Sequence, residues 1–308
     1  MEFYRYFIFI LFFAISSINS QKNWINNFTT NSTPNNLYQN TCQKGSLQSP
    51  VDLALNSSYY NSSLTIVSEN YKNITPSQIR TSDMYINLTI PSDLGSIVLE
   101  RYGYLNLYSL TDIRIKYPSE HSINGIKGSM EIQLIHKKVL GQIYPANQNI
   151  RIPDANMYLG ISLIYSTNTS SINNSDNGFA QNFISAFKNI SSPNVALNTY
   201  NITLGKRFFL YEGSDTNYPC DENFNWIVFS DFFNIDSNSL STVLTTYMPL
   251  FIGPSNIKLN ANLDYRPIFR NFKMQSNDTQ VYVYPINSSS RMRVELILIS
   301  IILLFLMN

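Results

Sequence analysis

The 308-residue chain has little of what most enzyme active sites use. It contains only two histidines, His121 and His136, and two cysteines, Cys42 and Cys220. A Ser-His-Asp triad or a Cys-His pair would therefore have to use one of these two histidines. No P-loop or dinucleotide-binding fingerprint is present. The common nucleophilic and nucleotide-dependent enzyme classes are thus disfavoured from the start.

Charge is also scarce, at 13% of residues, with 21 basic against 20 acidic side chains. This balance gives no electrostatic reason to expect a nucleic-acid partner. Aromatic residues are plentiful by contrast, with 21 Tyr and 19 Phe. Together with frequent β-branched residues and strong alternation, they favour a mainly β globular domain.

No apolar run reaches the ~20 residues that a membrane-spanning helix needs. The first run, 7–15, follows Arg5 and precedes small polar residues. This layout predicts a signal peptide over residues 1–20, with a transmembrane helix as the alternative.

The second apolar run, 296–307, would span about 18 Å as a helix, short of a ~30 Å hydrocarbon core. It follows small residues and a polar spacer, so we expect a signal for a glycolipid (GPI) anchor over 287–308. The alternatives are a marginal membrane helix or a tail buried in a partner. The remaining residues, 21–286, are predicted to form one extracellular, membrane-anchored domain.

An even pair of cysteines in a secreted chain predicts one disulfide. Closing a loop of about 180 residues would stabilise the fold by about 5 kcal/mol in the chain-entropy model. Twelve Asn-x-Ser/Thr sequons are present, which predicts a glycoprotein. Alternatively, an Asn- and Ser-rich composition generates some sequons by chance, and those in buried strands would stay unmodified.

Alternating polar and apolar residues predict strands along the chain. They are expected over 84–90, 104–110, 112–117, 130–136, 158–165, 207–211 and 225–229. Helical patterns are short and occur at 182–188 and 237–246.

Five motifs follow one another along the chain. They are 45–53 (GSLQSPVDL), 117–125 (YPSEHSING), 131–136 (EIQLIH), 211–220 (YEGSDTNYPC) and 264–267 (DYRP). In order and spacing they resemble signatures of the alpha-class carbonic anhydrases. The resemblance implies a single domain with a large, mostly antiparallel twisted sheet of about ten strands and short peripheral helices. It also implies the Cys42–Cys220 disulfide, because extracellular family members join cysteines at these two positions.

The resemblance also identifies where the family holds zinc, with three histidines in an H-x-H strand and an E-x-H strand. Those positions here are Arg114, Lys116 and Gln133. Arginine stays protonated, lysine would have to lose its proton beside a dication, and glutamine is a poor zinc ligand. We therefore expect no metal, no cofactor and no zinc-dependent hydration of carbon dioxide: a pseudoenzyme of the family.

Other family positions are retained. Glu120 and Thr216 match the pair that orients the zinc-bound hydroxide in the family, and here they are expected to serve packing. His121 and His136 match positions that make structural hydrogen bonds beside the site. No catalytic residue is therefore expected.

Two basic residues are predicted to share one strand face. Arg114 and Lys116 alternate with Ile113 and Ile115, and the acidic Asp215 replaces a leucine that lines the family's pocket. We interpret the three charged residues as a hypothetical cleft in which Asp215 compensates the cations. The alternatives are a solvated face, or a cleft that binds an anion or a partner's carboxylate.

The resulting expectation is a binding or interaction module at the cell surface, whose partner is an unidentified protein or an anionic ligand. Two alternatives stay open. One is an active carbonic anhydrase with an unorthodox zinc site, and the other is a structural surface glycoprotein.

Overall fold

The computed structural model describes residues 42, 45–74, 78–81, 86–91, 93–101, 104–140, 156–167, 195–196, 206–247, 260–261, 263 and 266–274. All described helices and strands lie in Met1–Lys273, the first of two compact units of the chain. The expected signal peptide, the expected anchor and the expected helix at 182–188 lie outside the described residues, as does Asp264–Tyr265 of the last motif.

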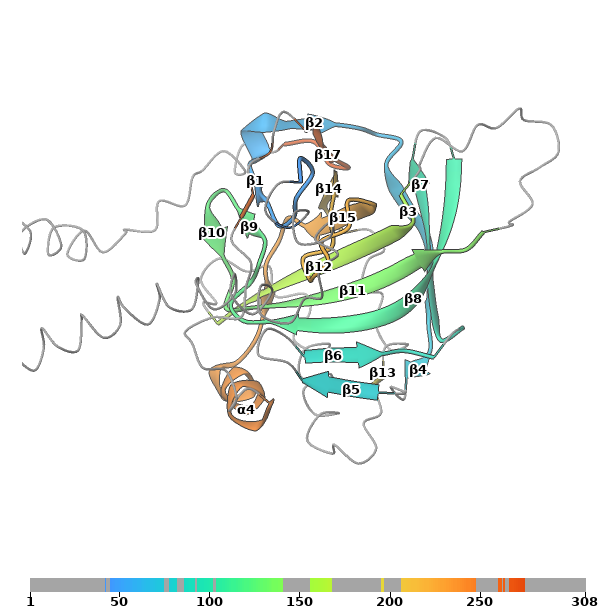
Figure 1. The fold of residues 1–308 in the computed structure, drawn as a ribbon. Coiled ribbons are helices and arrows are strands. Elements are labelled where there is room, and N and C mark those ends of the chain that lie inside the picture. Colours follow the sequence, from blue (N-terminus) through green and yellow to red (C-terminus); the bar gives the residue numbers. More distant parts are fainter. Residues whose placement is uncertain are drawn as a thin grey trace, which may run out of the picture. The chain divides into compact units, whose positions relative to one another are not determined.

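A large mixed sheet dominates this unit (Figure 1). Its central strands are, in spatial order, β14 (Phe208–Gly213), β15 (Phe224–Phe229), β12 (Tyr158–Ser166), β11 (Met130–Lys138) and β8 (Tyr104–Lys116). Beyond β14 come β17 (Ile268–Arg270) and then β2 (Ser58–Tyr60). Most neighbours are antiparallel, whereas β12 runs parallel to β15, and β17 runs parallel to β2. The mainly β, mostly antiparallel sheet predicted from the sequence is confirmed.

Strand β8 is long enough to carry two different neighbours on one edge. Its first half pairs with β7 (Gly95–Arg101), which in turn pairs with β3 (Thr65–Tyr71). Its second half pairs with β6 (Ile86–Thr89), followed by β5 (Gln78–Thr81). The two strands expected at 104–110 and 112–117 are therefore one continuous strand, and its pairing with β11 is irregular at Thr111, where the register shifts.

The short strand β16 (Phe233–Asn234) also belongs to the large sheet, where it runs parallel to the end of β12. The short elements outside this sheet are β1 (Asp52–Leu53), η2 (Leu55–Ser57), β4 (Asn73–Ile74), β9 (Ser122–Ile123), β10 (Ile126–Lys127), β13 (Val195–Ala196) and α4 (Ser237–Tyr247). Helix α4 confirms the expected helix at 237–246. Within the described part of the chain, the helices are too short or too polar to cross a bilayer.

Both faces of the sheet are covered, so the central strands are buried along most of their length. On β11, Ile132 and Leu134 pack in one hydrophobic core, whereas Ile135 belongs to a second core with Val228 and Trp226. Polar side chains of β8 and β11 interrupt this second core, and they form the candidate site.

The predicted disulfide between Cys42 and Cys220 is confirmed. It joins residues 178 positions apart and ties the start of the described domain to the motif at 211–220.

His136 is a neutral, buried part of the first core. Its Nδ1 donates to the carbonyls of Leu134 (3.1 Å) and Leu159 (3.3 Å), which can only accept. Its Nε2 lies 2.9 Å from the Tyr71 hydroxyl, which donates to it. Burial lowers the pKa of His136 from 6.5 to about 4, although the two carbonyls oppose this shift.

The lowered pKa of His136 predicts an acid-sensitive fold. Between pH 6.5 and pH 4 the unfolded chain binds more protons than the folded chain. The free energy of unfolding should therefore fall by about 3 kcal/mol as the pH is lowered from 6.5 to 4. His136→Gln keeps a donor and an acceptor but does not titrate, and its urea-unfolding profile should be flatter there. Tyr71→Phe, the matched control, keeps the imidazole and should keep the slope. An unchanged slope in His136→Gln would contradict this assignment.

Candidate functional site

The neighbouring strands β8 and β11 bring together Arg114, Lys116 and Gln133, the three residues at the positions where the family has its zinc-binding histidines. The pairing sets Gln133 opposite Arg114, and Glu131 opposite Lys116. Ile113 and Ile115 point into the first core, so the alternating Arg114 and Lys116 side chains lie on the opposite face. The predicted shared face is therefore observed in the structure.

Lys116 occupies the interior of the site with its side chain fully buried. Its Nζ lies 3.0 Å from Glu120 Oε1 and donates to Asn217 Oδ1 at 2.6 Å. The other Glu120 oxygen accepts from Gln133 Nε2 at 2.9 Å. A buried ammonium is tolerated only when it is paired and hydrogen-bonded, and these contacts supply both.

Arg114 forms the outer ion pair of the site. Its two terminal nitrogens donate to the two carboxylate oxygens of Asp215 at 2.5 and 3.0 Å, a bidentate arrangement. Asp215 also accepts from the backbone nitrogen of Asn217 at 2.8 Å. The Arg114 and Asp215 side chains are 10% and 15% exposed, so this pair lies nearer to solvent than Lys116–Glu120.

Glu131 is the most heavily hydrogen-bonded carboxylate of the site. One oxygen accepts from the backbone nitrogens of Glu120 (2.7 Å) and His121 (2.9 Å). The other lies 2.8 Å from His121 Nδ1 and accepts from Gln133 Nε2 at 3.0 Å. Burial alone would raise the pKa of Glu131, but His121 and these hydrogen bonds outweigh it and lower the pKa from 4.5 to about 2.

His121 links Glu131 of β11 to Tyr211 of β14. An ionised carboxylate only accepts, so His121 Nδ1 carries a proton. Its Nε2 lies 2.7 Å from the Tyr211 hydroxyl, which is 2.9 Å from Ser49 Oγ. Burial raises the pKa of Tyr211 far above its usual value, so the hydroxyl keeps its proton. His121 therefore has a full set of structural partners, as expected from the resemblance.

Residues of the other motifs are hydrogen-bonded to one another beside these contacts. Trp226 Nε1 donates to the Ser214 carbonyl at 2.8 Å, and Arg266 donates to the carbonyls of Gln48 and Glu212. Gly213 permits the close approach, since a Cβ there would lie 2.1 Å from Ser49 Oγ. Segments far apart in the sequence are thus fixed to one another beside the site.

Thr216 contacts Gln133 in this arrangement, with its hydroxyl 3.4 Å from Gln133 Oε1. Asn217, by contrast, was not expected to have a role. Its signal in the sequence is indirect: a lysine buried in a strand needs oxygen acceptors, and Asn217 lies within the 211–220 motif next to Thr216.

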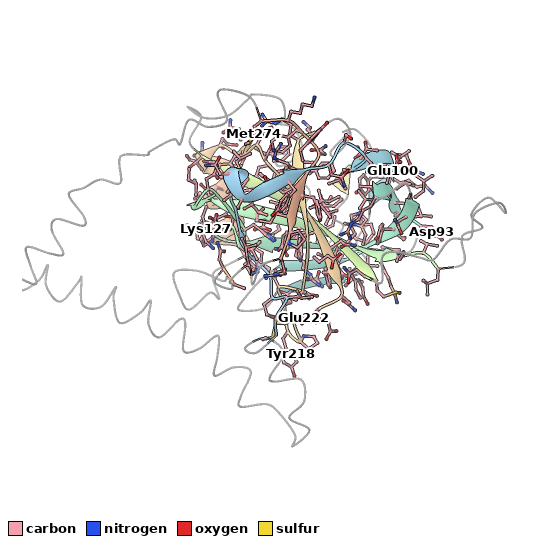
Figure 2. All side chains as sticks on the ribbon, turned by 90° about the horizontal axis from the view of Figure 1, so that it is seen from above. Asp93, Glu100, Lys127, Tyr218, Glu222 and Met274 are labelled. Carbon is pink, nitrogen blue, oxygen red and sulfur yellow. A yellow bond between two sulfur atoms is a disulfide. The ribbon has the colours of Figure 1, made fainter. Side chains whose placement is uncertain are left out.

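The outer rim of the site is a loop that includes Tyr218 and Glu222. Figure 2 shows these two side chains near each other at one end of the view. Tyr218 is 43% exposed, whereas Glu222 accepts from the Leu47 backbone and from Gln48 Nε2 at 2.7 and 2.8 Å. Glu222 therefore holds the 45–53 segment against this loop.

The donor set of the site does not fit zinc. Arg114 and Lys116 present protonated nitrogens without a lone pair, and the Gln133 amide already contacts Glu120, Glu131 and Thr216. Within the described ranges, no three His, Cys, Asp or Glu side chains are grouped in a way that could hold a metal ion. A set of two cations and an amide is suited to binding carboxylates, which is how the structure uses it.

Comparison with known proteins gives one consistent family. The family model for eukaryotic-type carbonic anhydrase matches residues 21–270. Dioscorin DB3S from Dioscorea polystachya is 27% identical over 189 residues, which are 61% of this chain and 63% of that protein. Alpha carbonic anhydrase 2 from Arabidopsis thaliana is 26% identical over 189 residues, covering 61% and 69% respectively. The match to dioscorin thus spans less than two thirds of its length.

Two solved structures share the fold. The crystal structure of dioscorin complexed with ascorbate has a TM-score of 0.60 and 21% identity, covering 82% of this chain and 94% of that chain. The alpha-carbonic anhydrase from Thermovibrio ammonificans, solved with the inhibitor sulfanilamide, has a TM-score of 0.52 and 17% identity, covering 74% and 89%.

The buried pair Lys116–Glu120 should contribute more to stability than the outer pair Arg114–Asp215. Lys116→Met leaves Glu120 buried without its cation and should lower the free energy of unfolding by about 3–5 kcal/mol. The double variant Lys116→Met/Glu120→Gln should recover most of that loss, because neither position 116 nor position 120 then carries a buried charge.

Arg114→Met and Arg114→Met/Asp215→Asn are the matched variants for the outer pair. They should change stability less than the inner-pair variants do, because the Arg114 and Asp215 side chains keep some exposure, whereas Lys116 and Glu120 are almost completely buried. Urea unfolding of all four variants measures how much of each arginine or lysine substitution's cost the second substitution recovers. Equal costs for Lys116→Met and the Lys116→Met/Glu120→Gln double variant would show that the inner pair is not coupled.

Proposed function

The chain belongs to the eukaryotic-type carbonic anhydrase family, and we propose that it is a binding module of that family which does not hydrate carbon dioxide through zinc. The observation that carries the proposal is the fully buried Lys116 Nζ, which stands at one of the three replaced positions and is hydrogen-bonded to Glu120 and Asn217. In the family these positions hold histidines, whose neutral nitrogens bind zinc, whereas an ammonium group has no lone pair to offer.

Catalysis of the family type also requires a metal-bound water that loses its proton near neutral pH. In this chain Glu120 accepts from Lys116 and Gln133, and Thr216 contacts Gln133. The two retained family residues therefore contribute to a stable polar interior. We assign the whole set of replaced and retained positions a structural role.

A protein partner is favoured over a small anion. Arg114 is held by both oxygens of Asp215, and Lys116 by Glu120. An incoming anion would have to displace a carboxylate that is already well placed, at a cost comparable to its own gain. The rigid outer surface that this interior supports is a better candidate for recognition, with Tyr218 exposed on the rim.

The disulfide supports residence in an oxidising compartment, since such bonds are typical of secreted and cell-surface proteins. Combined with the signal peptide expected at 1–20 and the anchor expected at 287–308, it leads us to propose display on the cell surface. Release of the intact protein from membranes by a phospholipase specific for glycolipid anchors would test the anchor.

The decisive test is zinc content together with carbon dioxide hydration on the purified, disulfide-bonded protein. We expect metal far below one equivalent and hydration at the rate of the buffer. Stoichiometric zinc with sulfonamide-sensitive turnover would overturn the proposal and establish the alternative of an unorthodox active site. Saturable binding of one defined protein ligand to the same preparation would separate a binding module from a purely structural coat glycoprotein.

Placing histidines at positions 114, 116 and 133 tests whether the side chains at these three positions alone determine whether the protein binds zinc. Arg114→His/Lys116→His/Gln133→His should be less stable than the unmodified protein without metal, because Asp215 and Glu120 lose their cations. Added zinc should raise its melting temperature, since metal binding then contributes to folding. The triple alanine variant at the same positions, the matched control, should show no zinc-dependent rise. An equal response of both variants would contradict the assignment of the ligand positions.

A further inference from the structure

The strand β2 lies at one end of the large sheet and pairs, among the described residues, with β17 (Figure 1). It exposes two aromatic side chains, Tyr59 at 64% and Tyr60 at 43%. Tyr59 packs beside the ring of Phe269, and the Arg270 guanidinium lies 5.8 Å from the Tyr60 ring centre. An edge strand with exposed aromatic residues invites pairing with another chain unless something covers it.

Two sequons flank this strand, one on each side. Asn56-Ser57-Ser58 lies in the turn η2 just before β2, and Asn61-Ser62-Ser63 begins directly after it. The Asn56 side chain is exposed, and Asn61 is half-buried at the turn. Because a strand advances about 3.3 Å per residue, the two asparagines stand at either end of a segment about 10 Å long.

The Asn61 amide is arranged so that its nitrogen is not required by the fold. Both the backbone nitrogen and the hydroxyl of Ser63 donate to Asn61 Oδ1, at 3.0 and 2.8 Å. N-glycosylation uses Nδ2, so these two bonds are compatible with a glycan at this position.

Asn87 provides the contrast within the same chain. Its sequon lies in β6, which pairs with both β5 and β8. Asn87 Nδ2 donates to Asp112 Oδ1 at 3.3 Å, so the atom that a glycan would modify is engaged inside the sheet. A glycan on Asn87 would therefore disturb a contact of its Nδ2, whereas the bonds between Asn61 and Ser63 leave the Asn61 Nδ2 uninvolved.

We propose that Asn56 and Asn61 carry N-linked glycans that cover β2 and keep its edge from pairing with a second copy of the chain. In the transfer, Asn Nδ2 forms a bond to the anomeric carbon of a lipid-linked oligosaccharide diphosphate. The bond from that carbon to the phosphate oxygen breaks, the lipid diphosphate leaves, and Nδ2 gives up one proton. The apolar faces of the sugars then lie against Tyr59 and Tyr60.

The first experiment measures which sequons are modified. The full chain is expressed in a eukaryotic secretory host, and glycopeptides are identified by mass spectrometry before and after peptide N-glycosidase treatment in heavy-oxygen water. We expect glycan on Asn56 and Asn61 in most molecules and on Asn87 in almost none. An unmodified Asn56 and Asn61, or full occupancy of Asn87, would overturn the proposal.

The second experiment tests the shielding role with Asn56→Gln/Asn61→Gln. The matched control is Asn70→Gln, the same change at an exposed asparagine of β3 that is not part of a sequon. Sedimentation velocity should show the double variant self-associating with a Kd lowered by about tenfold or more, whereas the control stays like the unmodified protein. Tyr59→Lys in the double variant should restore the monomer, because a charge on an edge strand opposes pairing. A monomeric double variant, or association that persists with Tyr59→Lys, would refute shielding of β2.

Discussion

The buried carboxylate of Glu131 is the constraint on which the rest of the site depends. A carboxylate this deep in a protein is stable only when nearly every lone pair is satisfied. Two backbone nitrogens, an imidazole and an amide meet that demand, and together they fix the course of the chain at Glu120 and His121. Through His121 the same requirement orients Tyr211 and Ser49. These hydrogen bonds therefore fix the part of this chain that surrounds the three replaced positions.

The lysine and arginine at positions 116 and 114 each depend on partner side chains that accept their hydrogen bonds. Lysine at position 116 is compatible with burial because Glu120 and Asn217 receive its protons. Arginine at position 114 is compatible because Asp215 lies on the opposite loop and is itself positioned by the Asn217 backbone. Any of these side chains alone would leave a buried charge or an unsatisfied acceptor, so their effects on stability are coupled.

Much of the fold was predictable from the sequence, because strands buried on both faces still show strong β-forming patterns. The strands at 130–136, 158–165 and 225–229 correspond to β11, β12 and β15. Strand β3 was missed because it is largely polar and a register shift between Ile66 and Ser68 breaks its alternation. The ion pair Arg114–Asp215 was anticipated as charge compensation, whereas Asn217 was not. Its role depends on a contact across 101 residues, which local pattern does not reveal.

The disulfide between Cys42 and Cys220 has a consequence for proteolysis. It encloses most of the described domain in one covalent loop, including β8, β11 and β12. A protease that cuts the backbone once anywhere inside this loop produces two chains that stay joined by the sulfur bridge. Such a nicked molecule would keep its mass under non-reducing conditions, and neither fragment would be shed. Loss of the domain by cleavage therefore requires a cut outside the loop, two cuts within it, or a reducing environment.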